Sequence, residues 1–175
     1  MCLLWRRDGN NCIKMSAGES EPKFLCDRMV GLLCRYLRFM GYDTTSANDL
    51  PPGNPREDTL LLEIAEKEER VILTKDAELA RRGGNNAIHI LSSDIYGQIS
   101  ELFRAGLIVL DLKLTRCSRC NNLLINGKTP QNINNGKIPE GVNLVYCPVC
   151  MRQYWEGSHA RNLRKVLDRV RSQIS

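Results

Sequence analysis

The chain has 175 residues, of which 42% are hydrophobic and 26% are charged. This composition is typical of a globular protein and excludes the disordered, collagen-like and fibrous classes. A chain of this length buries a substantial core, so it does not depend on disulfides to compensate for small size. No apolar run approaches the ~20 residues that a membrane-spanning helix needs, and the apolar start is too short for a secretory signal.

The net charge of +5 is unevenly distributed along the chain. Residues 24–110 hold ten Lys or Arg against thirteen Asp or Glu, whereas residues 111–175 hold eleven against four. An acidic part followed by a basic part suggests a metal- or substrate-handling region beside a region that binds a polyanion. Chance variation of the protein surface is the alternative explanation.

The first clear element is an apolar strand at residues 23–26, and we expect the leader before it, residues 1–22, to be unstructured. Apolar residues then recur at helical spacing from residue 28 to 40, beginning with Met29, and Gly41 ends this helix.

Strands and helices alternate through the segment that follows. After a loop at 51–55, which is rich in Pro and Gly, the pattern predicts helices at 57–67, 76–82 and 95–104 and strands at 71–74 and 87–91. Strands separated by helices imply right-handed βαβ units. The expected fold class is therefore α/β, a parallel sheet with helices on both faces.

Aspartates follow three of the predicted strands. Asp27, Asp76 and Asp94 each come one to three residues after a strand ends. Ligands of open parallel sheets bind beyond the carboxyl ends of the strands, so we expect these side chains in one cleft. Asp58, on the apolar face of the second helix, is a fourth candidate.

Carboxylates that converge repel one another unless a cation neutralises them, and oxygen ligands suit Mg²⁺ or Mn²⁺. Such an ion could orient a water, lower its pKa and stabilise charge on phosphodiester oxygens, which predicts hydrolysis of a nucleic-acid backbone. Structural roles are the alternative for three of the acids. Asp58 could lie in a helix first turn, and Asp76 and Asp94 could cap their own helices.

Four of the eight cysteines form two CxxC pairs that are 26 residues apart. The pairs are Cys117 with Cys120 and Cys147 with Cys150. Two such knuckles place four thiolates around one tetrahedral ion, which predicts a structural zinc with no open coordination position. A pair of redox dithiols or disulfides is the alternative. Reduced cysteines favour an intracellular location, cytoplasmic or nuclear.

Several segments, taken in order, resemble the RNase module at the carboxyl terminus of the mutator-seven-type exonucleases. They are Phe24–Asp27, Gly31–Asp43, Arg70–Asp76, both CxxC pairs and Tyr154–His159. The resemblance covers about residues 23–162. It implies a PIN-like nuclease domain at 23–112, a zinc ribbon at 113–157 and a basic carboxyl-terminal helix at 158–175.

The resemblance also implies a metal-dependent ribonuclease. Asp27, Asp58 and Asp76 would bind the catalytic Mg²⁺ or Mn²⁺, with Asp94 as a weaker fourth acid. Arg28 departs from the family, which commonly has an acidic residue after the first aspartate. A cation there could weaken metal binding or abolish turnover, which leaves an inactive RNA-binding or scaffold module as the alternative function.

Longer relatives carry a separate 3′–5′ exonuclease domain, for which this chain has no room. We therefore expect an isolated module, an isoform or a fragment, and an exonuclease domain is a partner only in those longer relatives. The RNA substrate, the mode of cleavage and the oligomeric state are not determined by the sequence.

Basic side chains predict contacts with RNA, expected to be single-stranded. The candidates flank or follow the two knuckles, lie off the apolar stripe of the first helix or follow the strand at 71–74: Arg35, Arg38, Lys75, Arg116, Arg119, Arg152, His159 and Arg161. His159 could instead be a structural residue at the start of the last helix. Tyr154 or Trp155 could stack on unpaired bases, or Trp155 could cover the zinc site.

Overall fold

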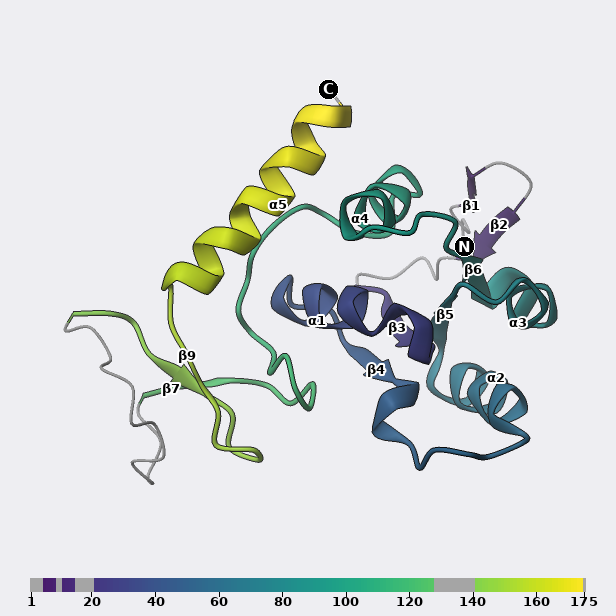
Figure 1. Cartoon of the computed structure of the whole chain (residues 1–175), viewed down its shortest axis with the longest axis horizontal. Coiled ribbons are helices and arrows are strands. Elements are labelled where there is room, and N and C mark those ends of the chain that lie inside the picture. Colours follow the sequence, from purple (N-terminus) through teal and green to yellow (C-terminus); the bar gives the residue numbers. More distant parts are fainter. Residues whose placement is uncertain (1–4, 9–10, 15–20, 128–140, 175) are drawn as a thin grey trace.

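The computed structural model describes residues 5–8, 11–14, 21–127 and 141–174 (Figure 1). At its centre is a four-stranded parallel sheet with the strand order β4-β3-β5-β6. The strands are β3 (Lys23–Cys26), β4 (Thr44–Ser46), β5 (Arg70–Thr74) and β6 (Ala87–His89). The expected α/β class with a parallel sheet is confirmed.

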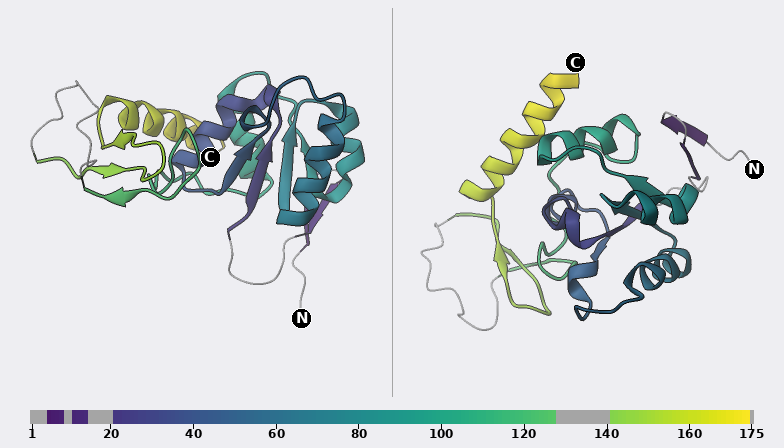
Figure 2. Two further views of the ribbon diagram at one scale, coloured as in Figure 1. Left: turned by 90° about the horizontal axis from the view of Figure 1, so that it is seen from below. Right: turned by 45° about the vertical axis from the view of Figure 1, so that its right-hand side comes forward.

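Helices cover both faces of the sheet (Figures 1 and 2). One face carries α1 (Gly31–Phe39) and α4 (Ile95–Arg104), and the other carries α2 (Glu57–Glu68) and α3 (Ala77–Gly83). The alternation of side chains along a strand explains the two layers, because Phe24 and Cys26 join the core beneath α1 and α4 whereas Leu25 joins the core beneath α2 and α3.

Two short elements differ from the expected pattern. Residues 28–30 form a 3₁₀ turn, η1 (Arg28–Val30), before α1 begins, and the tighter turn shifts the phase of the apolar stripe. Val30 is therefore buried, whereas Met29 is 63% exposed. The edge strand β4 was not predicted, since it has only three residues and all of them are polar.

The described part of the leader is a hairpin. Strand β1 (Trp5–Asp8) pairs antiparallel with β2 (Asn11–Lys14), so these eight residues have a secondary structure that was not expected of the leader. The remainder of the predicted leader lies largely outside the described residues, as does the segment 128–140 between the two knuckles.

A small antiparallel sheet follows the α/β unit. It contains β7 (Ile125–Asn126), β8 (Val145–Tyr146) and β9 (Gln153–Tyr154), and it carries the two CxxC pairs. The chain then returns through α5 (Ser158–Ile174), which lies beside α4 (Figure 1).

Helix α5 belongs to the main hydrophobic core. Leu167 and Val170 are buried in the cluster that lies beneath α1 and α4, so the last helix fastens the ribbon region to the α/β unit. Among the described residues, no helix is both long and apolar enough to cross a membrane.

Candidate functional site

The four CxxC cysteines converge on one point. Their Sγ atoms all lie within 4.8 Å of one another, and the pairs Cys117–Cys150 and Cys120–Cys147 are each separated by 3.4 Å. A tetrahedron with Zn–S bonds of ~2.3 Å has edges of about 3.8 Å, so the spacing fits a four-thiolate zinc site.

Both knuckles use the same backbone turn. The amide of Asn121 donates to the carbonyl of Cys117 at 2.9 Å, and the amide of Met151 donates to that of Cys147 at 3.0 Å. Asn121 and Met151 have φ of 65° and 59°, which turns the chain in the left-handed region directly after each second cysteine. Each pair of thiols is therefore positioned by its own local turn.

Four thiols at these distances cannot all ionise without a cation. Burial and hydrogen bonds with Cys117 raise the pKa of Cys150 to about 12. Burial would also raise the pKa of Cys120, but hydrogen bonds from Asn122 and the neighbouring thiols lower it to about 7. A divalent ion removes this conflict because it stabilises all four thiolates, so the donor set fits zinc.

Tyr154 of β9 supports the four-cysteine cluster. Its hydroxyl lies 3.1 Å from Cys117 Sγ and accepts a hydrogen bond from the Ser118 amide at 3.1 Å. Its ring packs edge-to-face on Phe39 of α1, with the centroids 6.2 Å apart. Tyr154 is 9% exposed, so it is a structural residue and its ring is covered.

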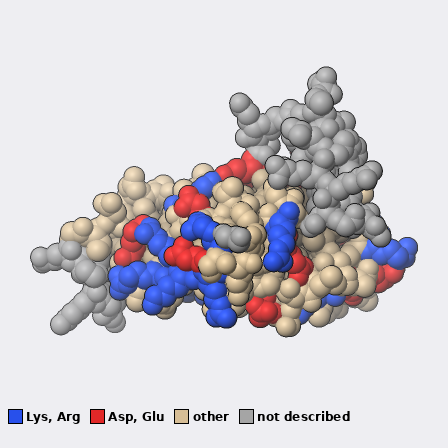
Figure 3. Space-filling view, turned by 90° about the horizontal axis from the view of Figure 1, so that it is seen from above, with Lys and Arg blue, Asp and Glu red and all other residues tan. Residues whose placement is uncertain are grey.

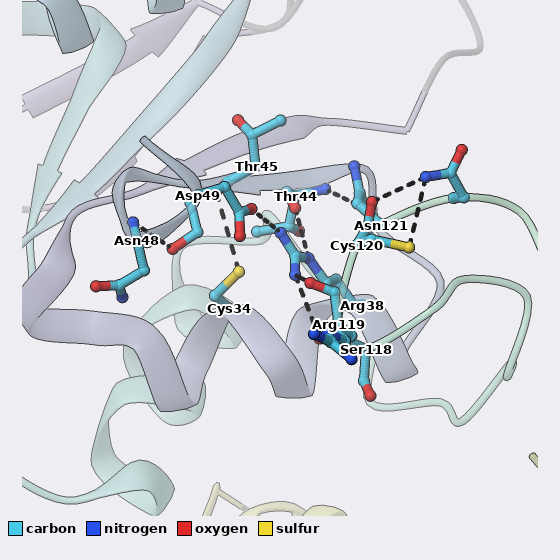
Figure 4. Close-up of polar contacts among 12 residues, drawn as sticks. Cys34, Arg38, Thr44, Thr45, Asn48, Asp49, Ser118, Arg119, Cys120 and Asn121 are labelled. Carbon is cyan, nitrogen blue, oxygen red and sulfur yellow. Dashed lines mark hydrogen bonds and ion pairs between the residues drawn. The ribbon is translucent and has the colours of Figure 1, made fainter. Parts of the chain in front are cut away.

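Arg38 of α1 joins the α/β unit to the first knuckle (Figure 4). Its guanidinium donates to the carbonyls of Ser118 and Arg119 at 3.2 and 2.7 Å, and to that of Thr44 at 2.8 Å. It also forms an ion pair with Asp49 at 3.0 Å. Arg38 is 3% exposed, which leaves its charge little access to a phosphate, in contrast to its predicted place on a free face.

A second set of contacts at the same junction centres on Asp43. Its Oδ1 accepts hydrogen bonds from Arg70 at 2.7 Å and Asn121 at 2.8 Å, and Arg116 lies 3.5 Å from its Oδ2. Burial alone would raise the pKa of Asp43, but these hydrogen bonds and charges lower it below its ordinary value. Arg116, another predicted RNA contact, is thus held by this junction.

Asp27 and Asp76 meet through Thr74 at the carboxyl edge of the sheet. The Thr74 hydroxyl donates to Asp27 Oδ2 at 2.7 Å and accepts from the Asp76 amide at 2.9 Å. Thr74 is fully buried and Asp27 is 9% exposed. The Thr-x-Asp spacing at the end of β5 is the sequence signal for this bridge.

Asp58 and Asp94, the other two predicted acids, have contacts of their own. Asp94 caps α4 and Asp76 caps α3, each accepting two backbone amides, as the structural alternative expected. The Asp58 side chain is 48% exposed and lies 3.8 Å from Arg82. Within the described ranges, the four cysteines are the only group of three or more potential ligands that is tight enough to hold an ion, so a catalytic metal at the four aspartates remains a prediction.

Arg28 forms an ion pair with Glu57, which sequence reasoning did not single out. The guanidinium binds both carboxylate oxygens, with the shortest contact 2.6 Å, and it also donates to the carbonyls of Leu50 and Pro51. The hydrogen bond from Arg28 holds the pKa of Glu57 below its ordinary value. The cation beside Asp27 is therefore directed toward α2.

The remaining predicted RNA contacts lie on the surface. Arg35, Arg119, Arg152 and Arg161 are exposed, Lys75 is half-buried, and the His159 side chain lies outside the described residues. On the face drawn in Figure 3, Lys and Arg side chains gather toward the end that carries the ribbon and α5. A cationic surface there agrees with the basic carboxyl-terminal part of the sequence.

Comparison with known proteins identifies a family. The model of the Mut7-C RNAse domain matches residues 22–167, a segment that contains the parallel sheet, the four cysteines and most of α5. No curated protein and no solved structure matches the chain. The matched segment is most of the chain, and it confirms the resemblance found in the sequence motifs. The chain therefore belongs to the Mut7-C RNAse domain family.

Proposed function

We propose that the chain is a metal-dependent ribonuclease that hydrolyses RNA phosphodiester bonds at the carboxyl edge of its parallel sheet. Membership of an RNase family supports the reaction class. The observation that carries the site is the Thr74 bridge, which joins the Asp27 carboxylate to the backbone amide of Asp76 at the ends of two neighbouring strands.

Each of these carboxylates keeps one oxygen for a ligand. Thr74 binds Oδ2 of Asp27, and two backbone amides of α3 bind Oδ1 of Asp76. No hydrogen bond between described residues reaches Asp27 Oδ1 or Asp76 Oδ2. A bound Mg²⁺ or Mn²⁺ would supply a polarised water and stabilise charge on the phosphate. Asp58 and Asp94 would complete the ligands from α2 and the start of α4.

The ribbon and the adjacent arginines would hold the RNA. Arg38 holds the first knuckle against α1, and Arg119 and Arg152 of the two knuckles remain exposed. Such cations neutralise phosphates and make affinity depend on salt.

Cleavage of single-stranded RNA in the presence of Mn²⁺ tests this function. We expect Asp27→Asn and Asp76→Asn to lower the rate at least ~100-fold, because each removes a ligand charge. Asp111→Asn is the matched control, since Asp111 is exposed and is not one of the four candidate metal-binding aspartates. Equal cleavage by all four proteins would assign the activity to a contaminant.

An inactive RNA-binding module is the second candidate, and Arg28 is the observation that favours it. A cation on the residue directly after Asp27 disfavours a dication there. Replacing it alone would place two acids face to face, because Arg28 contacts Glu57. The exchange Arg28→Glu with Glu57→Arg keeps an ion pair and puts an acid at position 28. Cleavage gained only by the exchanged protein would support the second candidate.

A further inference from the structure

We propose that a groove along α1 holds one unpaired nucleotide of the RNA, with its phosphate in a polar pocket and its base in an adjoining apolar pocket. The identity of the polymer rests on the proposed ribonuclease function. The nucleotide site itself rests on the two pockets, their charges and the residues that they share.

The polar pocket lies between the first turns of α1, the end of β4 and the first knuckle. Its volume is about 470 Å³, and it is lined by Gly31, Ser46, Asn48 and four arginines. Gly31 follows Asp27 by four residues, so the pocket and the first proposed catalytic acid are joined by one short segment of chain. A Cβ at Gly31 would lie 3.0 Å from the Asn48 side chain, so this glycine lets the loop after β4 lie close to the helix.

The charges of this pocket favour an anion. Asp49, the one acid that lines this pocket, forms an ion pair with Arg38, so their charges neutralise each other. The other three cations, Arg35, Arg119 and Arg152, have no acidic partner among the described residues, and all three are exposed. Three arginines from α1 and from both knuckles therefore surround a space that a phosphate would fill.

The apolar pocket lies between α1, β9 and the start of α5. Its volume is about 640 Å³, within the ~300–1,000 Å³ range of small-molecule sites. Aromatic side chains line it: Tyr36, Phe39, Tyr154 and Trp155. Phe39 and Tyr154 pack on each other, whereas Tyr36 and Trp155 are only half-buried and can present ring faces to a base.

The two pockets are adjacent. Arg35, Ser118 and Arg152 line both, so a ligand can place a charge in one and a ring in the other. Asn162, at the apolar pocket, adds an amide that can hydrogen-bond a base edge. An apolar peptide would leave three arginines unpaired and a free phosphate would leave the aromatic pocket empty, whereas a nucleotide satisfies both.

Binding of a fluorescent single-stranded RNA oligonucleotide, measured by anisotropy on the full zinc-loaded chain, tests the proposal. We expect Trp155→Leu to weaken binding about 5- to 100-fold and Trp155→Phe to retain most of the affinity, because the smaller ring still stacks. Arg35→Gln should weaken binding and reduce the salt slope by about one, whereas Arg104→Gln, an exposed arginine that lines neither pocket, should change affinity less than twofold.

An abasic oligonucleotide separates base contacts from phosphate contacts. The wild-type protein should bind the abasic strand as weakly as Trp155→Leu binds the normal RNA. Trp155→Leu should bind the abasic strand only slightly more weakly than it binds the normal RNA. If the base seats elsewhere, wild type and Trp155→Leu would lose affinity for the abasic strand equally, and the proposal would be overturned.

Tryptophan fluorescence gives a readout that does not depend on a disruptive variant. Trp5→Phe leaves Trp155 as the single tryptophan of the chain. RNA should quench its emission at saturation, whereas inorganic phosphate at the same ionic strength should not. Unchanged emission on saturation with RNA contradicts a base in this pocket.

The groove and the nuclease can fail separately. RNA binding that depends on Trp155 and Arg35 without cleavage by any divalent ion would uphold the groove and reject the ribonuclease. Cleavage that depends on Asp27 while Trp155→Leu and Arg35→Gln bind RNA as wild type does would uphold the ribonuclease and reject the groove.

Discussion

The cysteine cluster and the aspartate edge are both candidate metal sites, but they are built differently. The four thiols all lie within 4.8 Å of one another, whereas the aspartates come from four separate elements and only Asp27 and Asp76 share a hydrogen-bond partner. In Asp76 and Asp94, one carboxylate oxygen also accepts the capping hydrogen bonds of a helix.

The difference shows how ligands are positioned. Each CxxC pair is set by a turn within five residues, so only two such turns must meet. The aspartates depend on the register of a sheet and on helix starts, and their exposure differs, since Asp27 is buried whereas Asp76 is exposed. Four thiolates fit a structural ion, whereas carboxylate oxygens from separate elements suit the hard ions Mg²⁺ and Mn²⁺ of the proposed reaction.

Zinc removal should have the largest effect of any change. We expect Cys147→Ser to lose bound zinc and to lower the melting temperature by more than about 10 °C, because structural zinc contributes several kcal/mol of folding free energy. Cys34→Ser, at a buried cysteine outside the cluster, is the control and should keep one equivalent of zinc by atomic absorption. Full zinc content in Cys147→Ser would contradict the four-thiolate site.

Loss of Arg38 should weaken the contact between the α/β unit and the first knuckle. Arg38→Met leaves three carbonyls without their charged donor, so we expect the free energy of unfolding to fall by about 3 kcal/mol in urea titrations. Arg35→Met, on the same helix but exposed, should change stability by less than ~0.5 kcal/mol. Similar losses in both variants would mean that Arg38 does not dock the ribbon.

Acid should weaken the same junction through Asp43. Its pKa is lower in the folded protein than in the unfolded chain, so its contribution is present above the unfolded value of ~3.9 and is lost as pH falls through the folded value. We expect Asp43→Asn to lower the free energy of unfolding by about 1–3 kcal/mol at pH 7. Below pH 4 the free energies of the variant and the wild type should become more similar. A difference that is constant from pH 7 to pH 3 would exclude this linkage.

The capping aspartates should show the smallest effects on stability, and these can sharpen the comparison. Asparagine caps a helix as well as aspartate does, whereas alanine costs about 1 kcal/mol. Asp76→Asn should therefore keep its stability and lose cleavage, and Asp76→Ala should lose both. Asp94→Asn should likewise keep its stability, and Asp94→Ala should lose about 1 kcal/mol. Full cleavage by Asp94→Asn would mean that Asp94 only caps α4.

Elements with a strong local signal were predictable from the sequence. The strand at 23–26, the helix at 95–104 and the two CxxC pairs need only short-range patterns, and the structure has them where expected. The Thr-x-Asp step after β5 likewise places Thr74 and Asp76 by local spacing.

Tertiary structure alone decided which charged side chains are free. Arg35 and Arg38 lie three residues apart on α1 and both fall off its apolar stripe, yet only Arg38 is buried, because the first knuckle packs over that part of the helix. Arg28 is held by an ion pair with Glu57, 29 positions later. A single sequence encodes the chemistry of each side chain through its type and local turn, whereas its access to solvent and ligand depends on segments that meet only when the chain has folded.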